Sequence, residues 1–193
     1  MNGVAMCIWQ DGTSYTGEWK DCLKEGHGTL TFPDGSTYKG SFTNDQPNGD
    51  GVKLFPDGSK YEGCFFQGMF NGLGKFVQAS DGSTYDGYWR FNQMKGQGTK
   101  ITNKGLIEIS GNFDGNGLVT GKGQKRWKRV WYEQQEMYPF RNIRNEEIFL
   151  YRGDLVNSQI QGYGEFKWPD GRHYIGNFVN SQMQGVGKMS WTH

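Results

Sequence analysis

The residues that most often carry catalysis are sparse in this sequence of 193 residues. Its three histidines are His27, His173 and His193, and none has a carboxylate or cysteine at the spacing of a metal site. We interpret them as surface residues. No serine stands in a Gly-x-Ser-x-Gly elbow. The sequence therefore predicts a protein that is not an enzyme and that holds neither a metal nor a cofactor.

Two recurrent patterns resemble ligand sites but favour a structural role. Four recurrent aspartates of the repeat stand before the glycine of a predicted tight turn, a position where Asp is favoured for its hydrogen bonds to its own backbone. They are Asp34, Asp57, Asp81 and Asp170. Paired glycines such as Gly49-x-Gly51 also occur in dinucleotide loops, but here they lack the strand-to-helix setting that makes the anion site. We interpret the aspartates as turn residues and the glycines as strand residues.

One basic run departs from the neutral balance of the chain, whose formal net charge is +1. It interleaves basic residues with tryptophans: Lys122, Lys125, Arg126, Lys128 and Arg129, with Trp127 and Trp131. One interpretation is an irregular strand whose charged face is solvated. The other is a patch for an acidic partner: anionic lipid headgroups, an acidic tail of a cytoskeletal protein or, as the least favoured of the three, RNA. With so small a net charge, we expect no binding of nucleic acid.

The elements that must position these residues come from an internal repeat. The stretch Tyr38-Lys-Gly40-Ser-Phe42 recurs from Tyr15 and from Tyr61, a constant spacing of 23 residues. Self-similarity at such a period is typical of stacked supersecondary units. Rings and glycine alternate with polar residues, which predicts a strand with one aromatic face. Pro56-Asp57-Gly58 predicts a three-residue hairpin loop with its glycine in the left-handed region.

Further copies organise most of the chain. The repeat begins again at Tyr85, Tyr151 and Tyr174, and Ile109 to Phe113 is a degraded copy. Residues 124–150 contain no glycine and hold either an unrecognisable repeat or an inserted loop. We therefore expect a repeat array over residues 1–123, an irregular basic and aromatic segment over 124–150, and further repeats over 151–193.

These residues resemble MORN repeats, named for membrane occupation and recognition nexus. The family pattern is close to Tyr-x-Gly-x-(Trp/Phe), a spacer, Gly-x-Gly and then Asp-Gly. The resemblance implies an all-β fold: an elongated, single-layer antiparallel meander of stacked 23-residue hairpins, with an irregular insertion near 124–150. We expect each first-strand glycine to face a ring of the adjacent hairpin. The pattern residues are Tyr15, Gly17, Trp19, Tyr38, Gly40, Phe42, Tyr61, Gly63, Phe65, Tyr85, Gly87, Trp89, Tyr151, Gly153, Tyr174, Gly176 and Phe178.

Function is predicted largely by this resemblance, which implies an interaction module. Proteins that contain such repeats occur as scaffolds in cilia and flagella, radial-spoke heads among them, and in cytoskeletons. We expect a non-catalytic protein–protein scaffold of a ciliary or other cytoskeletal assembly. The alternative is a peripheral phospholipid-binding protein that uses the basic run. A third reading is a targeting module cut from an enzyme.

Rings outside the repeat pattern are candidates for partner binding. Phe66, Phe70, Tyr88 and Phe91 follow or flank a first strand, where the repeat places polar residues. Such rings are enriched at interfaces. The segments Val4 to Trp9 and Lys188 to His193 would form weakly protected edge strands. We therefore expect an edge to be covered by a partner strand, a second copy or the segment near Pro139.

The cysteines and the lack of long apolar runs indicate the cellular compartment of the protein. Cys7, Cys22 and Cys64 are odd in number and lack C-x-x-C spacing, which is typical of small apolar side chains in a reducing compartment. The sequence shows no apolar run of about 18 residues and no signal-peptide pattern. We expect a soluble cytoplasmic protein, located at the cytoskeleton or in a cilium or flagellum.

Overall fold

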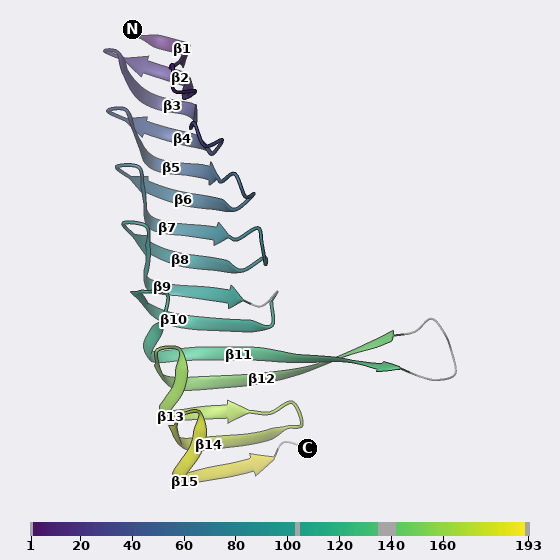
Figure 1. Cartoon of the computed structure of the whole chain (residues 1–193). Coiled ribbons are helices and arrows are strands. Elements are labelled where there is room, and N and C mark those ends of the chain that lie inside the picture. Colours follow the sequence, from purple (N-terminus) through teal and green to yellow (C-terminus); the bar gives the residue numbers. More distant parts are fainter. Residues whose placement is uncertain (1, 103–104, 135–141, 192–193) are drawn as a thin grey trace. The chain divides into compact units, whose positions relative to one another are not determined.

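The computed structural model describes residues 2–102, 105–134 and 142–191, which form strands and the short connections between them (Figure 1). The strands are β1 Gly3–Ile8, β2 Ser14–Lys20, β3 Leu23–Thr31, β4 Thr37–Thr43, β5 Gln46–Leu54, β6 Lys60–Phe66, β7 Met69–Val77, β8 Thr84–Arg90, β9 Gln93–Thr102, β10 Ile107–Gly115, β11 Val119–Gln134, β12 Asn142–Val156, β13 Gln159–Lys167, β14 Arg172–Val179 and β15 Gln182–Trp191. Within these residues, no helix is long and apolar enough to cross a membrane.

The sheet topology follows the chain. Strands β1 to β15 stand in sequence order, and each is hydrogen-bonded to its sequence neighbours in one open antiparallel sheet. The predicted all-β meander of hairpins is thereby confirmed. Contacts divide the chain into two units, which we describe separately. Unit 1 comprises Met1–Lys100 and Phe113–Gly117, and unit 2 comprises Ile101–Asn112 and Leu118–His193.

The irregular segment contributes strands to unit 2. Strands β11 and β12 pair continuously from Gly121 opposite Leu155 to Gln134 opposite Asn142. Its described residues therefore form two long paired strands. The sequence alone was compatible with either a degenerate repeat or an inserted loop in this segment. The expected coverage by the segment near Pro139 lies outside the described residues. The three-part division at 123 and 150 stays a prediction.

The loop over residues 56–58 has the predicted geometry. The N–H of Phe55 donates to the Ser59 carbonyl at 2.9 Å, the N–H of Gly58 donates to the Phe55 carbonyl at 2.9 Å, and Gly58 has a φ of 84°. Asp57 Oδ1 accepts the N–H of Ser59 at 2.9 Å, a bond that lowers the pKa of the Asp57 carboxyl. The same Asp-to-backbone bond recurs at Asp34, Asp81 and Asp170, as expected for turn residues.

Aromatic rings form the core on one face of the sheet. Tyr38 meets Phe42 of its own strand edge to face at 5.1 Å, and it meets Phe65 of the next repeat at 4.7 Å. This T-shaped arrangement is the favoured geometry of ring pairs. The repeat tyrosines are buried throughout: Tyr15, Tyr38, Tyr61, Tyr85, Tyr151 and Tyr174. Alternate residues of the same strands face solvent, because side chains alternate across a strand.

Each repeat tyrosine covers glycines of its own hairpin. Gly63 lies opposite Gly74, and a Cβ added to Gly74 would overlap the ring of Tyr61. The prediction that each first-strand glycine faces a ring of the adjacent hairpin is therefore wrong. The ring comes from the tyrosine two residues earlier, because residues i and i+2 share one face of a strand. The same holds for Gly17, Gly40, Gly87, Gly153 and Gly176.

The two glycines of each Gly-x-Gly pair have different roles, as β7 illustrates. Asn71, Gly72 and Leu73 stand opposite Cys64 alone, so the strand is irregular at this point. Gly72 adopts a φ of 95° there, a conformation that disfavours a side chain. Gly74 instead leaves room for the Tyr61 ring. The first glycine permits the irregularity, and the second permits the ring packing.

Candidate functional site

A hollow of about 730 Å³ lies on the solvent-facing side of unit 1. Its floor is a row of glycines, because Gly28, Gly40, Gly51 and Gly63 are paired one after another across β3 to β6. Its other lining residues are His27, Thr29, Lys39, Asp50, Val52 and Glu62. A groove floored by backbone rather than side chains can admit an extended chain close to the sheet.

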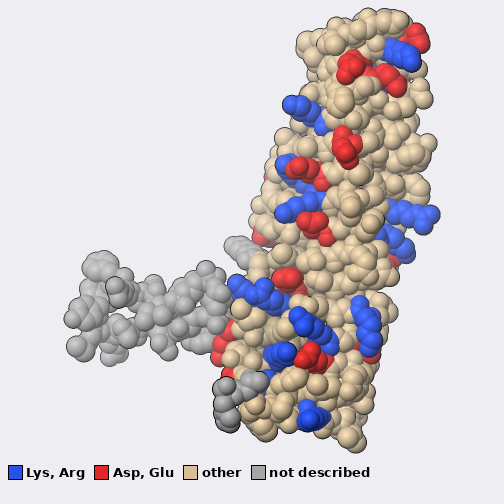
Figure 2. All heavy atoms as spheres, turned by 180° about the vertical axis from the view of Figure 1, so that it is seen from behind, with Lys and Arg blue, Asp and Glu red and all other residues tan. Residues whose placement is uncertain are grey.

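Both signs of charge surround this hollow. Lys39 and Glu62 lie among its lining residues, and Lys60 Nζ is 2.7 Å from Glu62, which lowers the pKa of that carboxyl. Asp50 accepts the Cys64 thiol at 3.1 Å, and this bond raises the pKa of the thiol. Cys64 is therefore held as an unreactive thiol. On the face drawn in Figure 2, basic and acidic side chains are likewise interspersed along unit 1.

Large apolar side chains continue this solvent-facing side over the next strands. Phe66, Leu73 and Tyr88 on this side are 42%, 55% and 49% exposed, and Phe91 in the turn after β8 is 49% exposed. We call these four residues the β6–β8 apolar patch. Leu73 of β7 lies directly opposite Tyr88 of β8. Phe66, Tyr88 and Phe91 were predicted partner-binding residues. Leu73 was missed, because only rings were considered off-pattern.

Phe91 occupies a strained turn position. Phe91 and Asn92 connect β8 to β9 with φ values of 48° and 65°. Two successive positive φ angles are typical of a type I′ turn, which favours Asn, Asp or Gly. Elsewhere Asn44 and Asp45 fill the equivalent positions. A bulky ring there costs free energy and is half exposed, with the Arg90 guanidinium 5.7 Å from its centroid.

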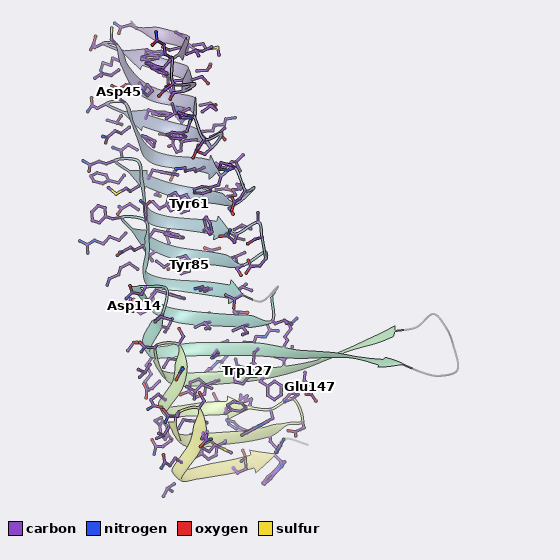
Figure 3. The ribbon with its side chains drawn as sticks, viewed as in Figure 1. Asp45, Tyr61, Tyr85, Asp114, Trp127 and Glu147 are labelled. Carbon is purple, nitrogen blue, oxygen red and sulfur yellow. The ribbon has the colours of Figure 1, made fainter. Side chains whose placement is uncertain are left out.

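Phe70, the fourth predicted interface ring, lies elsewhere. Its ring stacks on Tyr61 with centroids 3.7 Å apart and planes at 6°, and it meets Trp89 edge to face at 5.4 Å. Phe70 therefore belongs to the aromatic core of unit 1, the region around Tyr61 in Figure 3. Alternate residues counted back from Gly74 and Phe76 place Phe70 on this aromatic face, and it pairs with the buried Phe65.

The basic run does not form a single patch in its described part. Lys122 Nζ lies 2.8 Å from Asp154, and Arg126 lies 3.6 Å from Glu108, so each has a carboxylate partner. Lys125 pairs in register with the buried Tyr151 and lies on the aromatic side of β11. Lys128 lines a hollow described next. The side chains of Arg129 and Trp131 lie outside the described residues.

A second hollow, of about 550 Å³, lies within unit 2. Trp127 of β11 forms part of its wall and stacks on Phe149 of β12, with centroids 5.6 Å apart and planes at 5° (Figure 3). Trp127 also meets Phe166 edge to face at 5.5 Å. Lys125 Nζ donates to the Ser158 carbonyl at 3.2 Å, and burial lowers the pKa of the Lys125 ammonium.

His173 departs from its prediction as a surface residue. Its side chain is 22% exposed, with Nε2 2.7 Å from Glu165 Oε1 but not aligned with it as a hydrogen bond. Ser190 Oγ lies 3.5 Å from Nδ1. Glu165 is also paired with Lys167 at 3.1 Å. These distances suit a packed polar cluster between β13, β14 and β15. In the described part of the chain, no group of three His, Cys, Asp or Glu residues could hold a metal ion.

The hairpins correspond to a known family. The family model described as the MORN repeat matches residues 15–37, 38–60, 61–83, 85–106, 151–171 and 174–192, which together cover more than half of the chain. Each matched segment begins at a repeat tyrosine. A search of curated proteins finds no match. The hairpin of β10 and β11 lies outside the matched segments, although Phe113 and Val119 are buried there. The chain belongs to the MORN-repeat family.

Proposed function

We propose that this protein is a non-catalytic scaffold that binds a partner polypeptide on the solvent-facing side of unit 1. MORN repeats generally bind proteins or lipids. The observation that carries the choice of a protein is the β6–β8 apolar patch of Phe66, Leu73, Tyr88 and Phe91. Exposed rings on consecutive strands are typical of protein interfaces.

Three further features support partner binding on this solvent-facing side of unit 1. The patch shares β6 with the glycine-floored hollow, which an extended segment of the partner can enter. The hollow is lined by Lys39 together with Asp50 and Glu62, so it suits a polypeptide of mixed charge better than an anionic membrane. Phe91 presents a half-exposed ring from a strained turn position, which a binding role would explain.

The phospholipid alternative has less support. It required a single basic patch, but Lys122 and Arg126 are paired with carboxylates and Lys125 lies on the other side of β11. A ciliary or other cytoskeletal setting in the cytoplasm, and coverage of β1 or β15 by a partner strand or a second copy, remain part of the proposal. The setting rests on the family resemblance alone.

The test compares two variants in capture from a lysate of ciliated cells, read by quantitative mass spectrometry. The first variant combines Phe66→Ser, Tyr88→Ser and Phe91→Asn. The control combines Val156→Ser and Val179→Ser, which remove similarly exposed side chains from unit 2. We expect the proteins that the parent chain retains to be lost from the first variant and kept by the control. Equal retention by both variants, or flotation of the parent chain with anionic vesicles alone, contradicts the proposal.

A further inference from the structure

The hollow in unit 2 is a largely apolar pocket with two lysines, Lys125 and Lys128, among its lining residues. Its apolar surface comes from Leu106, Ile107, Trp127, Ile160 and Phe166. The N–H of Lys128 donates to the Leu106 carbonyl at 2.8 Å, which ties the turn before β10 to β11 and fixes that wall. A volume of about 550 Å³ falls within the range of small-ligand pockets.

Few protein groups balance the positive charge of the Lys125 ammonium in this hollow. Its one hydrogen bond is to the Ser158 carbonyl, and among the described residues no carboxylate lies within ion-pair distance of it. Burial lowers its pKa, and no neighbouring charge offsets this effect. Lysines of unit 1 are held differently. Lys24 pairs with Asp45 at 3.3 Å, and Lys53 lies over the rings of Phe32 and Phe55 at 5.1 and 5.2 Å.

The repeat does not require a cation at this position. Lys125 stands two residues after the second glycine of its pair, Gly123. The corresponding residues after Gly28, Gly74, Gly164 and Gly187 are Leu30, Phe76, Phe166 and Met189, whereas Lys53 and Lys100 follow Gly51 and Gly98. A half-buried ammonium among apolar side chains opposes folding, whereas an apolar residue there would favour it. Lys53, at the same repeat position, lies over two rings, but among the described residues Lys125 has neither a ring face nor a carboxylate, so its charge remains available to a ligand.

We propose that this hollow binds an apolar carboxylate, with the carboxylate on Lys125 Nζ and its aromatic or branched aliphatic group against Trp127, Ile160 and Phe166. The Lys125 ammonium lies among apolar side chains, where a doubly charged group is costly to desolvate, which favours a monocarboxylate with an apolar body over a phosphate group. Two sources share this chemistry: the C-terminal residue of a polypeptide and a free small carboxylic acid. Every residue named lies in unit 2, so the site is independent of the partner surface of unit 1.

The test uses the full chain with its lysines labelled as ¹³C-dimethyl-lysine, and Lys125→Arg assigns the Lys125 signal. N-acetylphenylalanine represents a free acid, and a ten-residue peptide ending in Phe represents a polypeptide terminus. The C-terminal amide of each probe is the uncharged control, and inorganic phosphate is the competing anion. We expect the carboxylate probes to shift the Lys125 signal, and the amides and phosphate to leave it unmoved. Tighter binding of the peptide identifies a polypeptide terminus as the source, and equal or tighter binding of the free acid identifies a small ligand.

Calorimetry with variants separates binding from folding. Lys125→Met should weaken carboxylate binding about tenfold or more, because it removes a charged hydrogen-bond donor. The same change should leave the melting temperature unchanged or higher. Lys53→Met, the matched change in unit 1, should leave the affinity unchanged. The proposal is overturned if acid and amide bind equally, if phosphate binds more tightly, if neither carboxylate binds at millimolar concentration, or if Lys125→Met binds as the parent does. The partner-capture test of unit 1 uses different residues and a different readout, so its failure would leave the result of this ligand test unchanged, and the reverse also holds.

Discussion

The hydroxyl of Tyr61 donates a hydrogen bond of 3.0 Å to the carbonyl oxygen of Cys64, three residues further along β6. Cys64 is the residue that stands alone opposite the irregular stretch of β7. The tyrosine thus satisfies a carbonyl at the irregularity while its ring covers Gly74. Tyr38 bonds to Ser41 and Tyr85 to Tyr88 in the same way. One side chain per repeat therefore links the core to the irregular strand.

Removing this hydroxyl should destabilise the fold modestly. Tyr61→Phe keeps the ring but leaves the Cys64 carbonyl without its donor, which we expect to cost about 1 kcal/mol of unfolding free energy. Tyr163→Phe is the matched control, because Tyr163 is an exposed tyrosine of unit 2. Urea denaturation followed by circular dichroism measures both variants. Equal unfolding free energies for the two would show that the bond contributes nothing.

Adding a side chain beneath the ring should be more damaging. A Cβ on Gly63 would lie 2.4 Å from Gly74 Cα and 2.5 Å from the Leu73 carbonyl oxygen, neither of which can move independently of the sheet. We expect Gly63→Val to lower the unfolding free energy by about 1–3 kcal/mol or more. Glu62→Val, at the exposed neighbouring position, should change it by less than about 0.5 kcal/mol. Thermal melts of the two variants give the comparison, and similar shifts would refute the packing described for Gly63.

Replacing the strained ring should favour folding. Phe91→Asn places a residue suited to positive φ in the turn between β8 and β9, so we expect the unfolding free energy to rise by about 1 kcal/mol. Phe66→Ser, which removes a patch ring without relieving strain, should give no such rise. Both variants should bind the partner more weakly. Urea denaturation and partner capture provide the two readouts, and a less stable Phe91→Asn protein would show that the ring serves the fold.

High pH should unfold the protein through its buried tyrosines. Burial raises the pKa of Tyr38, Tyr85 and Tyr151 from 10.0 to about 12. The folded state holds these protons more tightly than the unfolded state does. The stability they contribute is therefore fully present below about pH 10 and is lost as the pH rises towards about 12. Tyrosinate absorbance and circular dichroism should change together over that range. Full tyrosinate absorbance near pH 10 with an intact sheet would contradict these pKa shifts.

Sequence periodicity was enough to predict the strands and the loops, because each depends on local residue chemistry. Tyr61 and Phe65 fix the buried face of β6 by alternation, and Pro56 to Gly58 fix a hairpin loop. The roles of paired glycines could not be separated in the same way. Gly72 and Gly74 are identical in sequence, and only the register of β7 against β6 distinguishes them.

The candidate sites were less predictable, because they depend on which face a residue occupies. Phe66 and Phe70 are both off-pattern rings, but alternation from Tyr61 places Phe66 on the exposed side, whereas Phe70 pairs with the buried Phe65 and lies in the core. Lys122 and Lys125 belong to one basic run, but a spacing of three places them on opposite sides of a strand. Counting alternate residues from Gly123 places Lys125 on the same, aromatic side of β11, so the sequence was sufficient to predict the side of Lys125. The burial of His173 depends on pairing with β13 and β15, which its local sequence does not reveal.

The central claim is that a polypeptide binds the β6–β8 apolar patch, and photo-crosslinking in cells tests it most directly. A benzophenone amino acid replaces Tyr88 in one variant and Tyr163, an equally exposed tyrosine of unit 2, in the other. We predict a crosslinked protein from position 88, sensitive to Leu73→Ser on the facing strand, and little or none from position 163. Equal crosslinking from both positions, or crosslinks from position 88 to lipid alone, would contradict the claim.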